Sequence, residues 1–158
     1  MSQKWTTMDS PIGELLIRSR DGAITGIEFT PFAVPGDGHD DEEPVLQAAR
    51  DQLQGYFDGA RTEFDLPMEA SGTEFQRRVW QALRTIPYGK TTSYGEVAAS
   101  LGLKPAASRA VGTANGANPI PIMVPCHRVI GADGSLTGYG GGLDRKQILL
   151  RLEAPALF

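Results

Sequence analysis

The chain has 158 residues, 41% hydrophobic and 22% charged, so it can bury a core as one domain or as two small lobes that share a surface. No apolar run approaches membrane-spanning length and residues 1–5 hold no apolar signal region, which disfavours membrane and secreted classes. The net charge of −4 argues against binding of nucleic acid by the whole surface.

The charge is unevenly divided along the chain. Residues 1–71 carry 5 Lys/Arg and 14 Asp/Glu, a net charge of −9, whereas residues 72–158 carry 10 and 5, a net charge of +5. We therefore expect only the second half to meet a polyanion. The alternative is a pair of solvated surfaces that differ in charge.

Three short runs of apolar or β-branched residues, at 5–8, 15–18 and 24–29, predict strands in the first half. The dipeptide Asp21-Gly22 between the last two is a strong hairpin signal. The first half therefore reads as a small β-rich lobe.

A loop and a helix follow these strands. Residues 31–43 contain Pro, Gly and five acidic residues, which predicts a mobile loop, and His39 within it has no companion ligand. Apolar residues at helical spacing predict a helix over 44–57, which ends before Gly59.

The second half is predicted to be mainly helical. A capping box at 73–76 opens a helix that ends at 87–90, and a second at 93–96 opens a short helix to about Leu101. Residues 120–124 are predicted to be an apolar strand, 132–135 a hairpin turn and 138–142 a glycine-rich loop. The closing helix runs from about Leu143 or Asp144 to Glu153, with an apolar face built from Leu143, Ile148, Leu149 and Leu152.

A helix-turn-helix unit is predicted between these elements. The short helix ends at Gly102, and Pro105 suits the first turn of another helix that runs to about Asn115. Arg109 is the one long charged side chain on that second helix, whose small face would allow close approach to another surface; core packing explains the small residues equally well. The small residues are Ala106, Ala107, Ala110, Gly112 and Ala114.

The single cysteine, Cys126, is the strongest chemical signal in the sequence. A lone thiol forms no internal disulfide, and with two scattered histidines it makes a poor metal site. His127 and Arg128 directly after it create an electropositive setting that would lower the thiol pKa. The alternative is an inert thiol packed as a small apolar residue.

The sequence around this cysteine, from Asn118 to Ile130 (NPIPIMVPCHRVI), resembles the active-site segment of the O6-alkylguanine-DNA alkyltransferases. Four further stretches of that family's pattern occur in order: FQRRVW at 75–80, IPYGKTTSY at 86–94, SRAVG at 108–112 and GYGGG at 138–142. The resemblance is strong over residues 72–153 and general over 1–71.

The resemblance implies an α+β fold: a small N-terminal β-sheet and helix lobe (1–71, structural), then a mostly helical C-terminal domain (72–158) with a helix-turn-helix unit for DNA binding and alkyl transfer. It implies direct-reversal repair, in which the alkyl group of O6-alkylguanine, and of O4-alkylthymine, moves irreversibly to Cys126 in a single turnover. The base would be flipped out of the duplex, since its alkyl carbon is unreachable inside the stack.

The resemblance also assigns roles to individual residues. Catalytic roles fall on Cys126, His127, Glu153, Asn118 and Tyr94. Glu153 would orient His127, although the residues alone leave Asp133 and Asp144 open. A water is the expected link between Cys126 and His127, because neighbouring side chains of extended backbone point to opposite faces. Substrate or DNA contacts are expected from Arg109, which would fill the space that the base leaves, and from Ser93, Arg128, Val129, Tyr139, Gly140, Ala106 and Ala110.

We expect no cofactor and no metal. The glycine-rich loop lacks the dinucleotide and phosphate-loop patterns, and the first half, where some relatives hold zinc, has no cysteine and only His39. The expected partner is double-stranded DNA that contains O6-alkylguanine, with no membrane. The protein is expected to be a monomer in a reducing cytoplasm, while clustering on DNA stays open.

Two other classes compete with this function. A cysteine hydrolase would place its thiol at a helix N-terminus or tight turn, and the predicted strand before Cys126 weighs against it. A DNA-binding module without chemistry would leave Cys126 and His127 unexplained.

Overall fold

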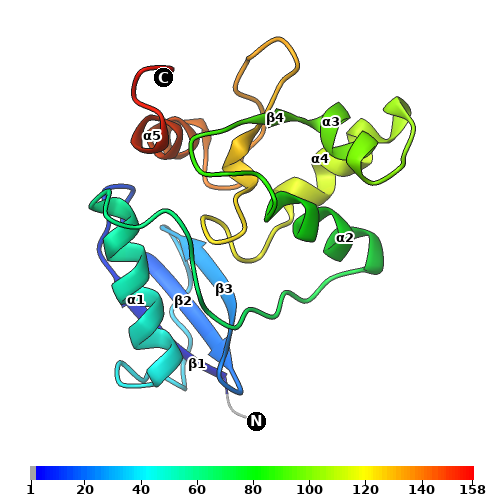
Figure 1. The fold of residues 1–158 in the computed structure, drawn as a ribbon. Helices are drawn as coiled ribbons and strands as arrows, with labels where there is room; N and C mark the ends of the chain where they lie inside the picture. The colour runs from blue at the N-terminus through cyan, green and yellow to red at the C-terminus, as the bar shows by residue number, and fades with distance from the viewer. Residues whose placement is uncertain (1–2) are drawn as a thin grey trace. The chain divides into compact units, whose positions relative to one another are not determined.

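The computed structural model describes residues 3–158; residues 1 and 2, part of the start that we expected to hold no signal region, lie outside the described part. It divides into an N-terminal unit, which ends at Ser71, and a C-terminal unit, Gly72–Phe158. The N-terminal unit is a three-stranded sheet with a helix and the C-terminal unit is mostly helical, so the predicted α+β class is confirmed (Figure 1). None of the described helices combines the length and hydropathy that a membrane span requires.

The N-terminal sheet is an antiparallel meander. Its strands are β1 (Gln3–Met8), β2 (Leu15–Arg20) and β3 (Ala23–Phe29), in the order β1-β2-β3. The β2–β3 turn has φ of 50° at Asp21 and 79° at Gly22. Positive φ at both central residues is what a tight hairpin needs, so the Asp-Gly signal is confirmed.

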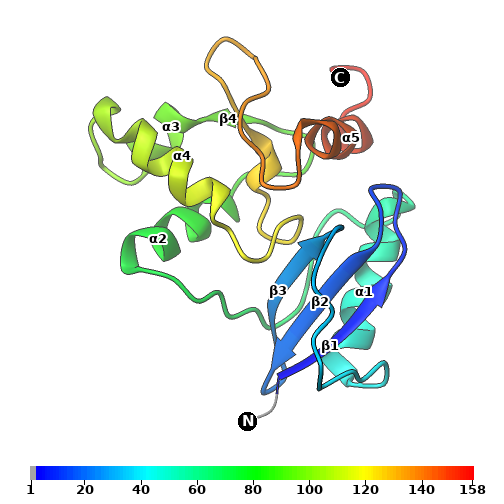
Figure 2. The same ribbon diagram turned by 180° about the vertical axis from the view of Figure 1, so that it is seen from behind.

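Helix α1 (Pro44–Phe57) covers one face of this sheet, as the two opposite views show (Figures 1 and 2). It begins where predicted because the Glu43 carboxylate accepts a hydrogen bond from the Leu46 amide (2.9 Å) and Pro44 occupies the first turn. Its buried face holds Val45, Leu46, Ala49, Leu53, Tyr56 and Phe57, the six residues that the spacing selects.

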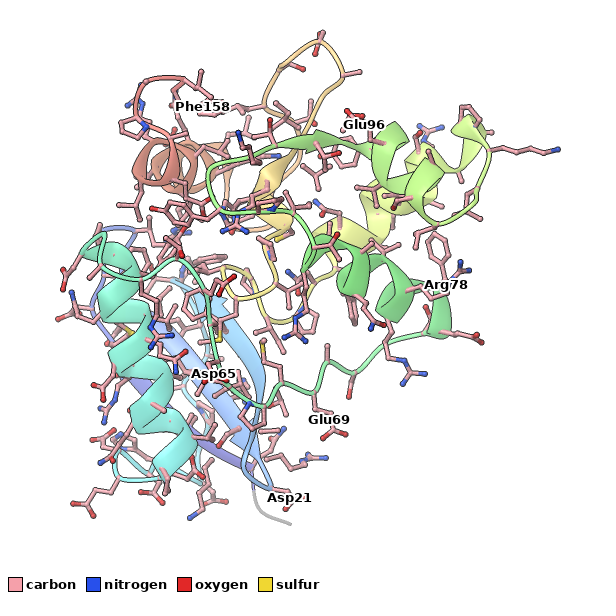
Figure 3. All side chains as sticks on the ribbon, in the orientation of Figure 1. Asp21, Asp65, Glu69, Arg78, Glu96 and Phe158 are labelled. Atoms are coloured by element: carbon pink, nitrogen blue, oxygen red, sulfur yellow. The ribbon has the colours of Figure 1, made fainter. Side chains whose placement is uncertain are left out.

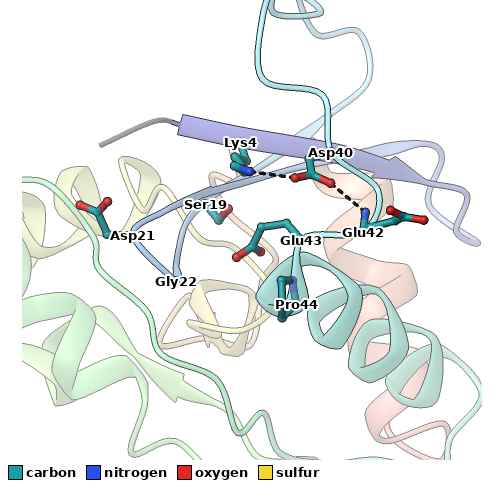
Figure 4. Close-up of a pocket in the computed structure, with 8 residues that line it drawn as sticks. All are labelled: Lys4, Ser19, Asp21, Gly22, Asp40, Glu42, Glu43 and Pro44. Carbon is teal, nitrogen blue, oxygen red and sulfur yellow. Dashed lines mark hydrogen bonds and ion pairs between the residues drawn. The ribbon is translucent and has the colours of Figure 1, made fainter.

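The acidic loop 31–43, which the sequence predicts to be mobile, contacts β1 through residues 37–40. Trp5 donates its indole N–H to the Asp37 carbonyl (2.8 Å), and the His39 ring stacks on Trp5 with centroids 4.4 Å apart. Lys4 pairs with Asp40 (2.9 Å) at the rim of an acidic recess beside the start of α1 (Figure 4). The five acidic residues of this loop are exposed or partly exposed. Asp21, Asp65 and Glu69, which are labelled in Figure 3, are exposed.

The C-terminal unit begins with α2 (Glu74–Leu83). Thr73 and Gln76 form the predicted capping box, with the Gln76 amide donating to Thr73 (3.1 Å) and the Thr73 amide to Gln76 (2.9 Å). The helix ends at Leu83, earlier than predicted, and Ile86 is buried in the turn that follows.

The helix-turn-helix unit is confirmed. Helix α3 (Tyr94–Ser100) is followed by a turn with φ of 74° at Gly102, a short 3₁₀ helix η1 (Pro105–Ala107) and helix α4 (Ser108–Gly116). Ser93 caps α3 by accepting the Glu96 amide (3.1 Å). Helix α4 is held to α2 by the Trp80 indole N–H, which donates to the Ala114 carbonyl (2.8 Å).

The segment before the cysteine is not the predicted strand. Residues 120–124 form a compact turn in which the Val124 amide donates to the Ile120 carbonyl (2.9 Å) and Ile122 has a φ of 75°. Strand β5 (Val129–Ile130) instead pairs in parallel with β4 (Thr92–Ser93). Residues 132–135 form a turn as predicted, but no hairpin, because the second strand is missing.

Helix α5 (Leu143–Glu153) closes the unit over the predicted range, but its buried face is different. Leu143 and Ile148 are 48% and 39% exposed. The buried positions are instead Lys146, Leu149, Leu150 and Glu153. Two charged side chains therefore point from α5 into the interior.

Candidate active site

Cys126 lies at the start of a 3₁₀ helix η2 (Cys126–Arg128), directly after the compact turn. Asn118 fixes this turn: its side-chain amide donates to the Val124 carbonyl (2.7 Å) and its side-chain oxygen accepts from the Ile120 amide (3.0 Å). The Cys126 amide then bonds back to the Val124 carbonyl (2.8 Å). This bend is the tight turn that we set as a condition for a cysteine hydrolase, so the strand argument against that class no longer holds.

Glu153 at the end of α5 binds both residues that follow the cysteine. Its Oε2 lies 2.7 Å from Nε2 of His127 and accepts a hydrogen bond from Nη2 of Arg128 (3.0 Å). Its Oε1 accepts a hydrogen bond from Nε of Arg128 (2.8 Å). Nη1 of Arg128 donates to the Ile86 carbonyl (2.7 Å). Of the three acids that the sequence left open, Glu153 is the one that contacts His127.

The protonation state of this cluster follows from its surroundings. Burial tends to raise the pKa of Glu153, but the hydrogen bonds and charges of His127 and Arg128 outweigh it and lower the pKa to about 2. Burial lowers the pKa of His127. His127 is therefore neutral, donates its Nε2 proton to the Glu153 carboxylate, and carries a free lone pair on Nδ1, which is buried without a hydrogen-bond partner among the described residues.

The Cys126 thiol is less acidic than its neighbours in the sequence suggest. Cys126 is 4% exposed, and burial raises its pKa to about 11, although the side chains of Asn118, Lys146 and Tyr139 act in the opposite direction. The expectation of a lowered pKa was wrong, because Glu153 takes up the Arg128 charge and desolvation keeps His127 neutral. The resting group is a thiol, and a thiolate must be produced for reaction.

A surface cavity of about 590 Å³ lies between α3, α4 and the loop 137–140. It brings together Tyr94, which we expected to be catalytic, and Arg109, Tyr139 and Gly140, which we expected to contact the substrate or DNA. Tyr139 also interacts with the Cys126 thiol, so the thiol lies behind one wall of the cavity. The remaining lining residues are Ser108, Gly112, Thr113, Gly116, Thr137 and Gly138.

Two glycines stand where the cavity walls are near each other, and an added Cβ would make ordinary van der Waals contact at either one. A Cβ at Gly112 would lie 3.6 Å from the Tyr94 ring, and one at Gly140 would lie 3.6 Å from the Gly116 carbonyl. Tyr94 donates its hydroxyl to the Thr137 carbonyl (3.3 Å) and accepts from the Thr137 hydroxyl (3.1 Å). Tyr94, to which the resemblance gives a catalytic role, is thus hydrogen-bonded to the opposite wall of the cavity.

Comparison with known proteins divides the chain between the same two units as the structure does. Residues 74–155 match the DNA-binding domain of 6-O-methylguanine DNA methyltransferase, and residues 3–70 match its ribonuclease-like domain. The chain belongs to the 6-O-methylguanine DNA methyltransferase family. That family is the one that the sequence motifs indicate.

Curated relatives and solved structures agree with this assignment. The methylated-DNA–protein-cysteine methyltransferases of Mycolicibacterium paratuberculosis and Mycobacterium tuberculosis are 54% and 52% identical, with alignments over 95% and 96% of this chain and 92% and 94% of theirs. The crystal structure of M. tuberculosis OGT in complex with DNA superimposes with a TM-score of 0.88 at 51% identity, covering 97% of this chain and 96% of that one. A Methanococcus jannaschii O6-methylguanine DNA methyltransferase reaches 0.70 at 27% identity, with 94% and 92% covered.

Three predicted contacts of this methyltransferase family member are engaged inside the protein. Arg128 is buried against Glu153, which corrects its assignment to DNA. The carbonyls of Cys126, expected to be catalytic, and Val129, expected to contact the substrate or DNA, accept hydrogen bonds from Nδ2 of Asn115 (3.3 Å) and Nζ of Lys146 (2.6 Å). Ala106, Arg109 and Ala110 are exposed on η1 and α4, and Ser93 is half-buried at the α3 cap.

Sequence reasoning missed two buried polar residues of this site, Asn115 and Lys146. Lys146 follows Asp144 and Arg145, so its position in the sequence indicates a solvated face. Asn115 falls in the last turn of α4, where an asparagine normally indicates only the end of a helix. Within residues 3–158, no group of three or more His, Cys, Asp or Glu side chains is placed to hold a metal ion.

Proposed function

We propose that this protein repairs DNA by direct reversal, transferring the alkyl group of O6-alkylguanine, and of O4-alkylthymine, to its own Cys126. The observation that carries the proposal is the arrangement of one buried thiol, a neutral His127 with a free Nδ1, and a carboxylate that fixes the His127 tautomer. Close similarity to methylated-DNA–protein-cysteine methyltransferases over nearly the whole chain supports it.

The chemistry needs one proton route and one leaving group. The thiol proton moves through a water to Nδ1 of His127, and Glu153 stabilises the imidazolium that forms. The thiolate attacks the alkyl carbon, so the S–C bond forms while the C–O6 bond breaks and its electrons pass to guanine. The guanine anion then takes up the proton from the His127 imidazolium, so that both groups end neutral, and the repaired guanine leaves the cavity still joined to the DNA. The thioether that forms has no good leaving group, so the protein cannot regenerate its thiol and each molecule acts once.

The cavity of the C-terminal unit suits a base that has left the duplex. Its volume of about 590 Å³ falls in the range of small-molecule sites. Arg109, exposed on α4, would occupy the gap in the stack, while Tyr94 would exchange its bond to Thr137 for one to the purine. Tyr139 would line the pocket between the base and the thiol.

DNA binding is assigned to the C-terminal unit and a structural role to the N-terminal unit. The charges of +5 and −9 support this division, since phosphate contacts come from basic surfaces. The exposed Ala106 and Ala110 beside Arg109 would let α4 approach the backbone closely. A free thiol acceptor fits a reducing cytoplasm.

The decisive experiment is mass spectrometry of the protein after incubation with duplex DNA that contains O6-methylguanine. We expect a permanent gain of one methyl group on the Cys126 peptide, no turnover beyond one equivalent, and no gain in Cys126→Ser. The serine variant should keep DNA affinity, since the thiol is buried and affinity is expected from the basic residues of the C-terminal unit.

The other two classes predict different results in the same assay. Release of product beyond one equivalent would identify a hydrolase. Binding of DNA with an unmodified thiol after long incubation would leave only a binding module.

A further inference from the structure

Lys146 is a fully buried charged side chain that the alkyl-transfer chemistry described above does not use. Its Nζ donates to the Val129 carbonyl (2.6 Å) and to the Thr137 carbonyl (2.8 Å). Val129 directly follows the turn that holds the thiol, and Thr137 lies in the wall of the cavity and binds Tyr94. One ammonium group thus connects α5 to both sides of the candidate active site.

The buried charges around the thiol do not balance in the resting protein. Glu153 neutralises Arg128 through two hydrogen bonds, and His127 is neutral. Lys146 is left with two neutral carbonyls and forms no ion pair among the described residues. A buried ammonium without an anion is costly. The acidic group that acts on it is the Cys126 thiol.

We propose that Lys146 is a positioning residue that holds the thiol-bearing turn to the cavity wall and serves as the counter-charge of the Cys126 thiolate. This inference rests on the proposed function. When the thiol loses its proton, the thiolate supplies the anion that the buried site lacks. When the thiolate becomes a neutral thioether, that anion is lost again.

A specific pH dependence follows from this pairing. Burial lowers the pKa of Lys146 to about 8 and raises that of Cys126 to about 11. As the pH rises through about 8, the pair loses its first proton, and the one-proton form divides between thiol with amine and thiolate with ammonium in a fixed ratio. The rate of thiol alkylation should therefore rise up to about pH 8 and then level off.

The neighbouring ionisable groups do not produce this profile. Burial lowers the pKa of His127 and raises that of Tyr139 well above its usual range, while that of Glu153 is about 2. Arginine side chains keep their charge in proteins, which covers Arg128 and Arg145. Between pH 7 and 10, Lys146 is the facing group expected to change charge.

The test uses iodoacetamide, a neutral alkylating agent that needs no DNA, and Cys126 as the chain's only thiol. In the wild type we expect the alkylation rate to level off near pH 8. In Lys146→Met the rate at pH 7 should fall at least about tenfold, the equivalent of one pKa unit, and the profile should keep rising to pH 10. Lys146→Arg keeps the charge, so it should restore most of the rate and show no levelling near pH 8.

Two controls separate this role from a purely structural one. Leu149→Ala removes buried packing from the same helix, and Arg151→Met removes an exposed charge from it. The first should lower the melting temperature without changing the pH profile, and the second should change neither.

A Lys146→Met profile with the wild-type shape, or a wild-type rate that climbs steadily past pH 8, would overturn the counter-charge role. If Lys146→Met does not fold, the profiles of the wild type and Lys146→Arg still decide. Failure of the wild type to accept methyl from DNA would instead overturn the proposed function, and it leaves the iodoacetamide result unaffected.

Discussion

The two units of this chain treat charged side chains in opposite ways. In the N-terminal unit the ion pairs are at least partly exposed, as in Lys4–Asp40, where the side chains are 40% and 32% accessible. In the C-terminal unit Arg128, Lys146 and Glu153 are buried. Exposed pairs contribute little to stability, whereas a buried charge is retained at a cost. The buried charges therefore lie in the C-terminal unit, which also holds the candidate active site.

The largest expected effect comes from breaking the buried cluster. Glu153→Gln removes the carboxylate that neutralises Arg128 and orients His127. We expect the free energy of unfolding to fall by roughly 3–5 kcal/mol, as is typical when a buried charge loses its partner. We also expect nearly all alkyl transfer to be lost. Urea unfolding and single-turnover transfer assays measure the two. A variant with wild-type stability would show that the cluster is dispensable for the fold.

The same cluster should respond to acid. Because the Glu153 pKa is lowered from 4.5 to about 2, its contribution is fully present above about pH 4.5 and is lost as the pH falls toward 2. The shift corresponds to about 3 kcal/mol. Urea unfolding of the wild type and Glu153→Gln between pH 5 and 3 should show the difference in stability shrinking. A constant difference would contradict the lowered pKa.

How far the sequence predicts this molecule depends on whether a feature is local. Helix starts were predictable because Thr73, Ser93 and Glu43 cap through bonds to residues three positions away. The contacts of Lys146 were not predictable, because the two carbonyls that its Nζ binds lie 17 and 9 residues before it in the sequence.

Two further errors have the same origin. The apolar run 120–124 looks like a strand, yet Asn118 and the positive φ of Ile122 turn it into a loop. The thiol pKa was assigned in the wrong direction because sequence neighbours show which charges are near Cys126. They do not show that Glu153, 25 residues after Arg128, neutralises one of them.

A smaller effect is expected at the exposed surface of the C-terminal unit. Arg109→Ala should lower transfer from duplex DNA by roughly tenfold to a hundredfold, since an extrahelical base without a substitute in the stack costs a few kcal/mol. Reaction with free O6-alkylguanine base, which requires no flipping, should hardly change. Both rates and the melting temperature are measured on the same variant. Equal losses on both substrates would refute the role of Arg109 in base flipping.

DNA affinity should depend on salt through the same surface. If two phosphates are contacted, affinity falls roughly tenfold between 50 and 200 mM salt. Fluorescence anisotropy with Cys126→Ser measures this without transfer. An affinity that does not change with salt would argue against phosphate contacts.

The smallest effect is predicted for the N-terminal unit. Asp40→Asn removes the partly exposed partner of Lys4, and its unfolding midpoint in urea should stay within error of the wild type. It serves as the matched control for Glu153→Gln, since both remove one carboxylate charge. A similar loss in both variants would remove the contrast between the two units.

The burial of Cys126 has a consequence for how long an unused molecule keeps its single chance to act. With a pKa of about 11, only about one thiol in ten thousand is ionised at pH 7. Oxidants and stray electrophiles react with thiolates, so they meet almost none. With the proposed function, the acceptor would stay reduced until it meets a damaged base, so the dose of lesions rather than the age of the protein would set its lifetime.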